Sequence, residues 1–202
     1  MKQILPKVEF RYSWIYDENL KEWTKAPRER KKFSSQKILN YIKTVEPLWR
    51  KHEKSVLREM SKVLELPWHA KKIPCYVVAW STPFSDPLTV PFRPDKNRFI
   101  DTLTHELIHQ LFFQGNNVKR AAHAWQYIHR KYKREQFNTR IHVPLHAVHE
   151  HIFRCHFGED RLDKEYAWMK HFNDYKRSWD IVKKDGYLNI INEFRGRTKR
   201  GI

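Results

Sequence analysis

The chain has 202 residues, of which 40% are hydrophobic and 14% aromatic, and its formal net charge is +17. This supply of large side chains can build a core, so the composition excludes a disordered chain, and the lack of an internal repeat excludes a solenoid or propeller. The excess of lysine and arginine fits a nucleic-acid partner bound through a basic surface, and it fits a well-solvated basic protein equally well.

Cysteine usage and hydropathy indicate where the protein works. Cys75 and Cys155 are too few for a disulfide framework and suit a reducing compartment. The first residues lack the apolar segment of a signal peptide, and no run reaches the roughly 20 apolar residues that cross a bilayer. We therefore expect a cytoplasmic protein with no membrane partner.

The first part of the chain is predicted to form a strand and a long helix. Residues 8–16 alternate aromatic and polar side chains, as a strand does, and the charged segment 17–32 reads as a connection. Apolar residues at helical spacing then predict a helix that begins at Ser34 and is closed by Pro67. Pro47 must kink that helix or divide it.

Two further strands are expected before the chain becomes helical. The β-branched and aromatic run 73–80 is the clearest strand of the sequence. Prolines surround the short apolar segment 88–92, which predicts an edge strand or an extended loop there.

From residue 96 onwards the apolar pattern is helical. The three glycines Gly115, Gly158 and Gly186 stand where helix C-caps are expected. The fold class predicted from this order is α+β, with one domain over residues 1–194 and a flexible basic tail over 195–202. The expected helices cover residues 96–113, 117–135, 144–157, 160–171, 174–184 and 187–194.

The chemistry of the chain is concentrated in the segment HELIH, residues 105–109. On a helix, residues four apart lie one turn above each other, so His105 and His109 can both reach one Zn²⁺. Glu106 is one residue further round, beside the metal, where it can accept a proton from a metal-activated water. The sequence thus predicts His105 and His109 as zinc ligands and Glu106 as the catalytic base.

The context of this segment strengthens that interpretation. An apolar stripe requires the helix to be buried, and two imidazoles and a carboxylate in a core are costly unless something compensates them. A bound metal would do so. The alternative is a set of core histidines satisfied by hydrogen bonds from their neighbours. The stripe consists of Ile100, Leu103, Leu107, Ile108, Leu111 and Phe112.

The HELIH segment resembles the active-site helix of the zincin metallopeptidases. The resemblance implies a zincin-like fold, with a small sheet, an active-site helix and a mostly helical second half. It also implies a zinc-dependent hydrolase that cleaves a peptide or protein substrate. In zincins an edge strand before the active-site helix holds the substrate as an added strand, and residues 88–92 are the candidate for that strand here.

A catalytic zinc site needs a third protein ligand and one open position. The metzincin pattern HExxHxxGxxH is absent, so this ligand is expected from a later helix that begins at Pro144. His146 is the favoured ligand, with His149 and Glu150 as rivals. His142, placed just outside that helix, is expected to support the metal or the oxyanion without binding the metal itself.

A histidine ligand from a following helix is similar to SprT-like zincins, which act on DNA-bound proteins, and the net positive charge agrees with that likeness. The main alternative function is a basic, nucleic-acid-associated protein whose zinc or histidine cluster is structural. The neighbouring Cys155 and His156, near Glu159, are interpreted as packing residues and not as a second metal site, and Cys75 as a small core residue.

Overall fold

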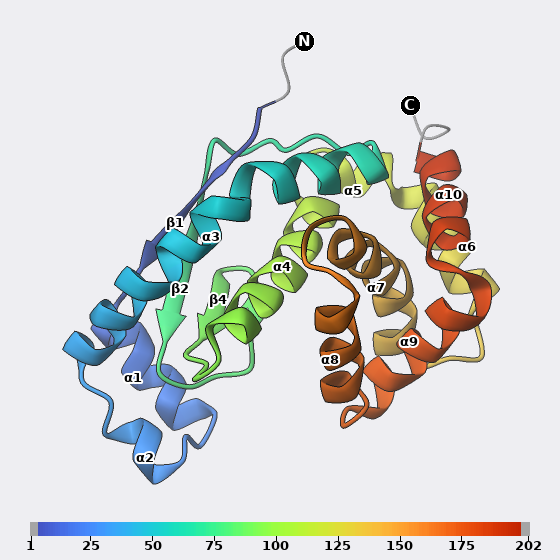
Figure 1. Cartoon of the computed structure of the whole chain (residues 1–202). Coiled ribbons are helices and arrows are strands. Elements are labelled where there is room, and N and C mark those ends of the chain that lie inside the picture. Colours follow the sequence, from blue (N-terminus) through green and yellow to red (C-terminus); the bar gives the residue numbers. More distant parts are fainter. Residues whose placement is uncertain (1–3, 199–202) are drawn as a thin grey trace. The chain divides into compact units, whose positions relative to one another are not determined.

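The structure is a computed structural model that describes residues 4–198 (Figure 1). Its architecture is α+β, as predicted, with a small mixed sheet in the N-terminal half and helices beyond it. The residues group into two compact units. The first takes the chain up to Lys54 together with Ala70–Gln110, and the second takes Ser55–His69 and the chain from Leu111. The single domain expected over 1–194 stays a prediction, because this grouping does not test whether the units fold separately.

The sheet lies in the first unit and has the strand order β1-β2-β4-β3. Strand β2 is parallel to both β1 and β4, and β3 is antiparallel to β4. The four strands are β1 (Lys7–Arg11), β2 (Lys72–Val78), β3 (Phe84–Ser85) and β4 (Leu88–Pro91).

The prediction that residues 88–92 form the edge strand is wrong. Strand β4 lies between β2 and β3, where Leu88 and Thr89 pair with β3 on one side and Thr89 to Pro91 pair with β2 on the other. Pro87 precedes the strand and Pro91 ends it, so neither proline interrupts the ladder. The edge of the sheet on this side is the short strand β3.

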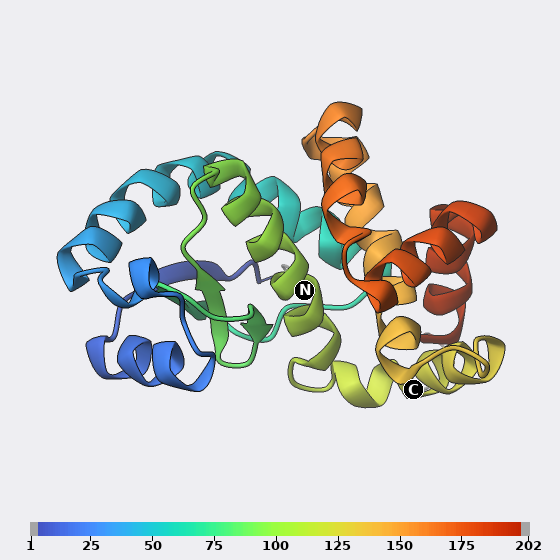
Figure 2. The ribbon, with the colours of Figure 1, turned by 90° about the horizontal axis from the view of Figure 1, so that it is seen from below.

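Helices cover both faces of the sheet: α1 (Trp14–Trp23) lies on one side in Figure 2, with α3 (Ser35–Leu64) and α4 (Lys96–Phe113) on the other. The short helix α2 (Arg28–Lys31) lies between α1 and α3 in the chain. Tyr16 of α1 meets Tyr76 of β2 edge to face at 5.2 Å. On the opposite face, Phe99 of α4 packs against Phe10 of β1 at 6.0 Å and against Tyr41 of α3 at 5.5 Å.

Helix α1 occupies part of the segment expected to be a connection. The predicted strand ends at Arg11, because the Ser13 side chain accepts a hydrogen bond from the Tyr16 backbone and starts a helix. Asp17 then accepts a 2.6 Å bond from the backbone N–H of Ala79, which ties α1 to the end of β2. The long helix α3 contains Pro47 and continues through it without division.

The second unit is helical. Helix α7 is central, in contact with α8, α9 and α10, and α10 also contacts α6. The helix expected over 117–135 is divided at Ala121 and ends at Lys131. The helices are α5 (Asn117–Arg120), α6 (Ala122–Lys131), α7 (Phe137–His156), α8 (Glu159–Met169), α9 (Asn173–Asp185) and α10 (Tyr187–Thr198).

Helix α7 begins at Phe137 instead of at Pro144, so Pro144 lies inside it. Proline lacks a backbone N–H, which removes one helical hydrogen bond but leaves the helix intact here. Of the predicted basic tail, residues 195–198 belong to α10, and residues 199–202 lie outside the described residues. Within residues 4–198, no helix has both the length and the apolar character that a bilayer crossing requires.

Candidate metal centre

The HELIH segment lies on α4, whose bounds match the predicted helix. Its apolar stripe is buried as expected: Ile100, Leu103, Leu107 and Leu111 are at most 2% exposed. Thr104, just before the motif, donates its hydroxyl to the carbonyl of Ile100 at 2.8 Å and so satisfies its own polar group within the helix. Aliphatic packing along one stripe therefore stabilises this helix in its buried position.

The two motif histidines lie one helical turn apart. His105 is buried and His109 is half-buried, and their ring centroids are 5.1 Å apart with the planes at 70°. Two imidazoles in this arrangement can each offer a nitrogen to one ion with Zn–N bonds of about 2.0–2.1 Å. The pair therefore fits two positions of a zinc site.

Glu106 is 5% exposed. Burial raises the pKa of its carboxyl to about 8, because removal from water disfavours the charged form. In residues 4–198, the side chain has no hydrogen-bond or ion-pair partner that would offset this cost. Burial first, and the Glu106 charge second, raise the pKa of the buried Cys75 thiol in β2. A carboxyl group that changes charge near neutral pH suits acid–base work.

A contact from α4 also reaches the edge of the sheet. Gln110, which follows His109, donates its side-chain amide to the backbone carbonyl of Ser85 in β3. The short edge strand is thus attached to the turn of α4 that carries the second motif histidine.

The predicted third ligand, His146, lies on α7 and is fully buried. Its Nδ1 is 2.7 Å from the Ser178 hydroxyl, which itself donates to the carbonyl of Tyr175 at 2.9 Å. Because that hydroxyl has only one proton, His146 must donate from Nδ1, which leaves the lone pair on Nε2. Sequence reasoning missed Ser178 as a positioning residue, since nothing in the pattern of α9 indicates which residue of α7 it meets.

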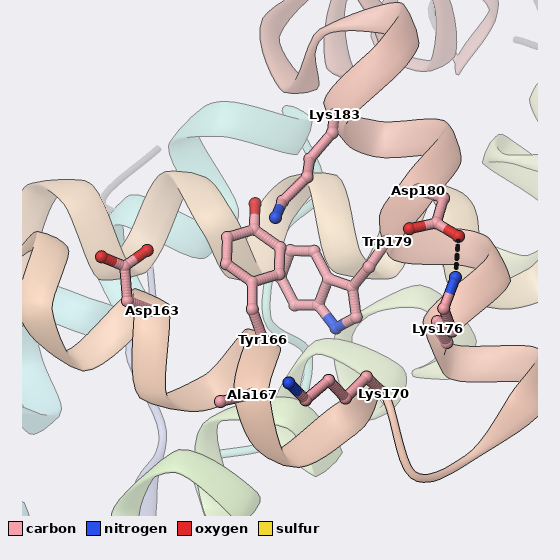
Figure 3. Close-up of a pocket in the computed structure, with 8 residues that line it drawn as sticks. All are labelled: Asp163, Tyr166, Ala167, Lys170, Lys176, Trp179, Asp180 and Lys183. Carbon is pink, nitrogen blue, oxygen red and sulfur yellow. Dashed lines mark hydrogen bonds and ion pairs between the residues drawn. The ribbon is translucent and has the colours of Figure 1, made fainter.

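Trp179 packs against the face of the His146 ring. Its indole stacks on the imidazole at 4.3 Å with the planes at 6°. The same indole, with the edge-on ring of Tyr166, lines a pocket of about 370 Å³ between α8 and α9 (Figure 3). Lys183 lies over the Tyr166 ring there, 3.8 Å from its centroid. Trp179 thus connects the wall of this pocket with the surroundings of His146.

His142 lies inside α7, one turn before His146, and not outside the helix as predicted. Its Nδ1 is 2.8 Å from the carbonyl of Asn138, so Nδ1 donates and Nε2 holds the lone pair. Burial lowers the pKa of His142 to about 4 against the opposing effect of that carbonyl, and the ring is therefore neutral at pH 7. A neutral imidazole with one nitrogen fixed is the form that binds a metal.

The two rivals of His146 have different surroundings. Glu150 accepts from Arg154 on one carboxylate oxygen at 2.9 Å and from Tyr166 on the other at 2.7 Å. These two donors already compensate the burial of the Glu150 side chain. His149 is fully buried and meets the ring of Phe153 edge to face at 4.7 Å.

In comparisons with known proteins, no family model, no curated protein and no solved structure matches this chain. The basic surface for nucleic acid, expected from the net charge, stays a prediction. The function of the chain is therefore inferred from the chemistry of α4 and α7.

Proposed function

We propose that the chain is a zinc-dependent hydrolase of the zincin type that cleaves peptide bonds. The observation that carries the proposal is Glu106, a deeply buried carboxyl group between two histidines one turn apart, with no partner in residues 4–198. Such a group is costly to folding, and a proton-transfer role at a metal-activated water accounts for it.

Each residue of α4 then has a defined role. His105 and His109 would hold the metal through one imidazole nitrogen each. When bound, zinc would polarise the scissile carbonyl and lower the pKa of a water. Glu106 takes a proton from the attacking water and delivers it to the leaving amine, so the peptide bond is replaced by a carboxyl and an amino group.

The third ligand is proposed to come from α7. His146 is the candidate from the sequence, and His142 is supported as well by its neutral ring and its fixed Nδ1. Both rings have Nδ1 hydrogen-bonded and an aromatic ring against them within the second unit. His142 and His146 are therefore both candidates for the third ligand, each through Nε2.

The test measures zinc content and hydrolysis of a quenched fluorescent peptide library. His105→Ala and His109→Ala should each lose one zinc per chain together with hydrolysis, whereas Glu106→Gln should keep that zinc and lose hydrolysis. His142→Ala and His146→Ala identify the third ligand by which of them releases zinc. His123→Ala, at an exposed position of α6, is the matched control and should change neither quantity.

The alternative of a structural zinc makes the opposite prediction. Most structural sites are closed by four protein ligands and leave no position for water. Zinc retained in Glu106→Gln, together with an unchanged rate of peptide hydrolysis, would overturn the assignment of Glu106 as the base.

A further inference from the structure

Away from the HELIH helix, a second set of metal-ligating side chains meets inside the second unit. Glu59 belongs to the last part of α3, and His151 and Cys155 lie one turn apart on α7. One ligand atom from each lies within 4.8 Å of the other two. His151 Nε2 is 3.0 Å from Glu59 Oε1 and 3.6 Å from Cys155 Sγ.

These separations are close to those of a tetrahedral zinc site. Zn–S bonds of about 2.3 Å and Zn–N or Zn–O bonds of about 2.0–2.1 Å at tetrahedral angles place sulfur about 3.6 Å from nitrogen and nitrogen about 3.3 Å from oxygen. The sulfur–nitrogen distance already matches. The nitrogen–oxygen distance needs to lengthen by only a few tenths of an ångström, because the two atoms now share a hydrogen bond in place of an ion.

The charges around the cluster favour a cation. Glu59 brings an acidic side chain to the cluster, and its Oε1 is the oxygen that contacts His151. Lys62 approaches Oε2 at 3.5 Å, which leaves Oε1 on the side of His151. The side chains of His151 and Glu59 are 15% and 19% exposed, and Cys155 is exposed, so an ion and a water can reach all three.

We propose that Glu59, His151 and Cys155 form a second metal site, which takes a zinc-class divalent ion with a water as its fourth ligand. The ion joins α3 to α7 within the second unit and stabilises that unit, because it binds the folded arrangement and not the unfolded chain. This site shares no residue with the proposed hydrolytic centre and does not depend on it.

The sulfur atom gives the site a signature that the HELIH helix cannot produce. Co²⁺ added to the metal-free protein should give a thiolate-to-metal charge-transfer band in the near ultraviolet, at one equivalent for this site. The measurement is made in the double variant His105→Ala/His109→Ala, which disables the proposed hydrolytic centre. The band should persist there, so the two proposals can fail separately.

Variants assign the ligands. Cys155→Ser should abolish the band, and His151→Ala and Glu59→Gln should weaken Co²⁺ binding by more than about tenfold. Cys75→Ala should keep the band, because Cys75 is fully buried in the first unit. His156→Ala, next to Cys155 but outside the cluster, should keep it as well.

Zinc should also raise the thermal unfolding midpoint of the double variant, and added Cys155→Ser should remove that increase. Absence of the band in the double variant, or a band that survives Cys155→Ser, would overturn the proposal.

Discussion

Glu106 on α4 and Glu150 on α7 form a natural pair for comparison. Each follows a histidine directly, and each is 5% exposed. Glu150 gives both carboxylate oxygens to donors, Arg154 and Tyr166. Glu106 has no such donor in residues 4–198, and burial raises its pKa to about 8. The same dipeptide at the same depth is thus compensated in one helix and left uncompensated in the other.

The difference teaches how to separate function from structure in a buried carboxylate. A carboxylate with two donors stabilises the fold and resists other chemistry, because every reaction must first break its bonds. A carboxyl group without donors contributes nothing to stability, so its presence calls for a functional reason. Matched substitutions at the two positions can test this distinction.

The largest effect is expected on activity. Glu106→Gln keeps the size of the side chain and removes its ability to exchange a proton, so peptide hydrolysis should fall by about 10²–10⁴-fold or more. Glu150→Gln is the matched control and should stay within a few-fold of the wild-type rate, measured at a temperature where both variants are folded. Equal losses of hydrolysis in the two variants would contradict a catalytic role for Glu106 and a structural role for Glu150.

For the free energy of unfolding, the order of the two effects should reverse, with the larger loss in Glu150→Gln. Glu150→Gln should lower the free energy of unfolding by about 2 kcal/mol, less than the 3–5 kcal/mol of a fully buried pair because the Arg154 side chain is 35% exposed. Glu106→Gln should not lower the stability of the metal-free protein at pH 7. Urea unfolding followed by circular dichroism measures both. A clear destabilisation by Glu106→Gln would show that this carboxylate has a structural partner.

A smaller effect is expected at the phenol that binds Glu150. Tyr166→Phe removes one hydrogen bond to a carboxylate and keeps the ring against Trp179, so we expect a loss of about 1–2 kcal/mol. In the double variant with Glu150→Gln the two losses should not add, because they remove the same bond. Full additivity of the two losses would show that Tyr166 and Glu150 stabilise the fold independently of each other.

The smallest effect belongs to an exposed pair. Arg177 donates to both oxygens of Glu135, and their side chains are 55% and 20% exposed. This hydrogen bond lowers the pKa of Glu135 from its usual 4.5, so its contribution is present above pH 4.5 and is lost as the pH falls through the lowered value. Arg177→Gln should cost less than about 1 kcal/mol at pH 7, and its difference from wild type should vanish in acid. An equal difference at pH 2 would exclude the ion pair as its cause.

The sequence predicts well those elements whose signals are local. The bounds of α4 follow from its aliphatic stripe, and all three glycines expected to end helices have positive φ angles, for example 82° at Gly186. The misplaced elements depend on partners elsewhere. Helix α1 docks through Asp17 on β2, and β4 is enclosed by a strand of only two residues. Neither relation leaves a periodic pattern in the chain.

The same limit applies to the sites. The HELIH spacing is visible in the sequence, and so is the four-residue spacing of His151 and Cys155. Glu59 is far from that pair along the chain, and only the packing of α3 against α7 identifies it as their neighbour. The tautomers of His142 and His146 likewise depend on a backbone carbonyl and on a serine of another helix.

The two cysteines differ in burial, so thiol labelling can measure whether the two units unfold together. A thiol reagent should modify the exposed Cys155 at once, whereas Cys75, at 0% exposure, should react only in molecules whose first unit has opened. The labelling rate of Cys75 in increasing urea therefore gives the opening free energy of that unit alone. This opening free energy can be compared with the free energy of unfolding measured from the helical signal, to which the second unit contributes most. If the two values are equal, the two units unfold as one domain. If the opening free energy is smaller, the sheet and its HELIH helix open while the helical unit stays folded.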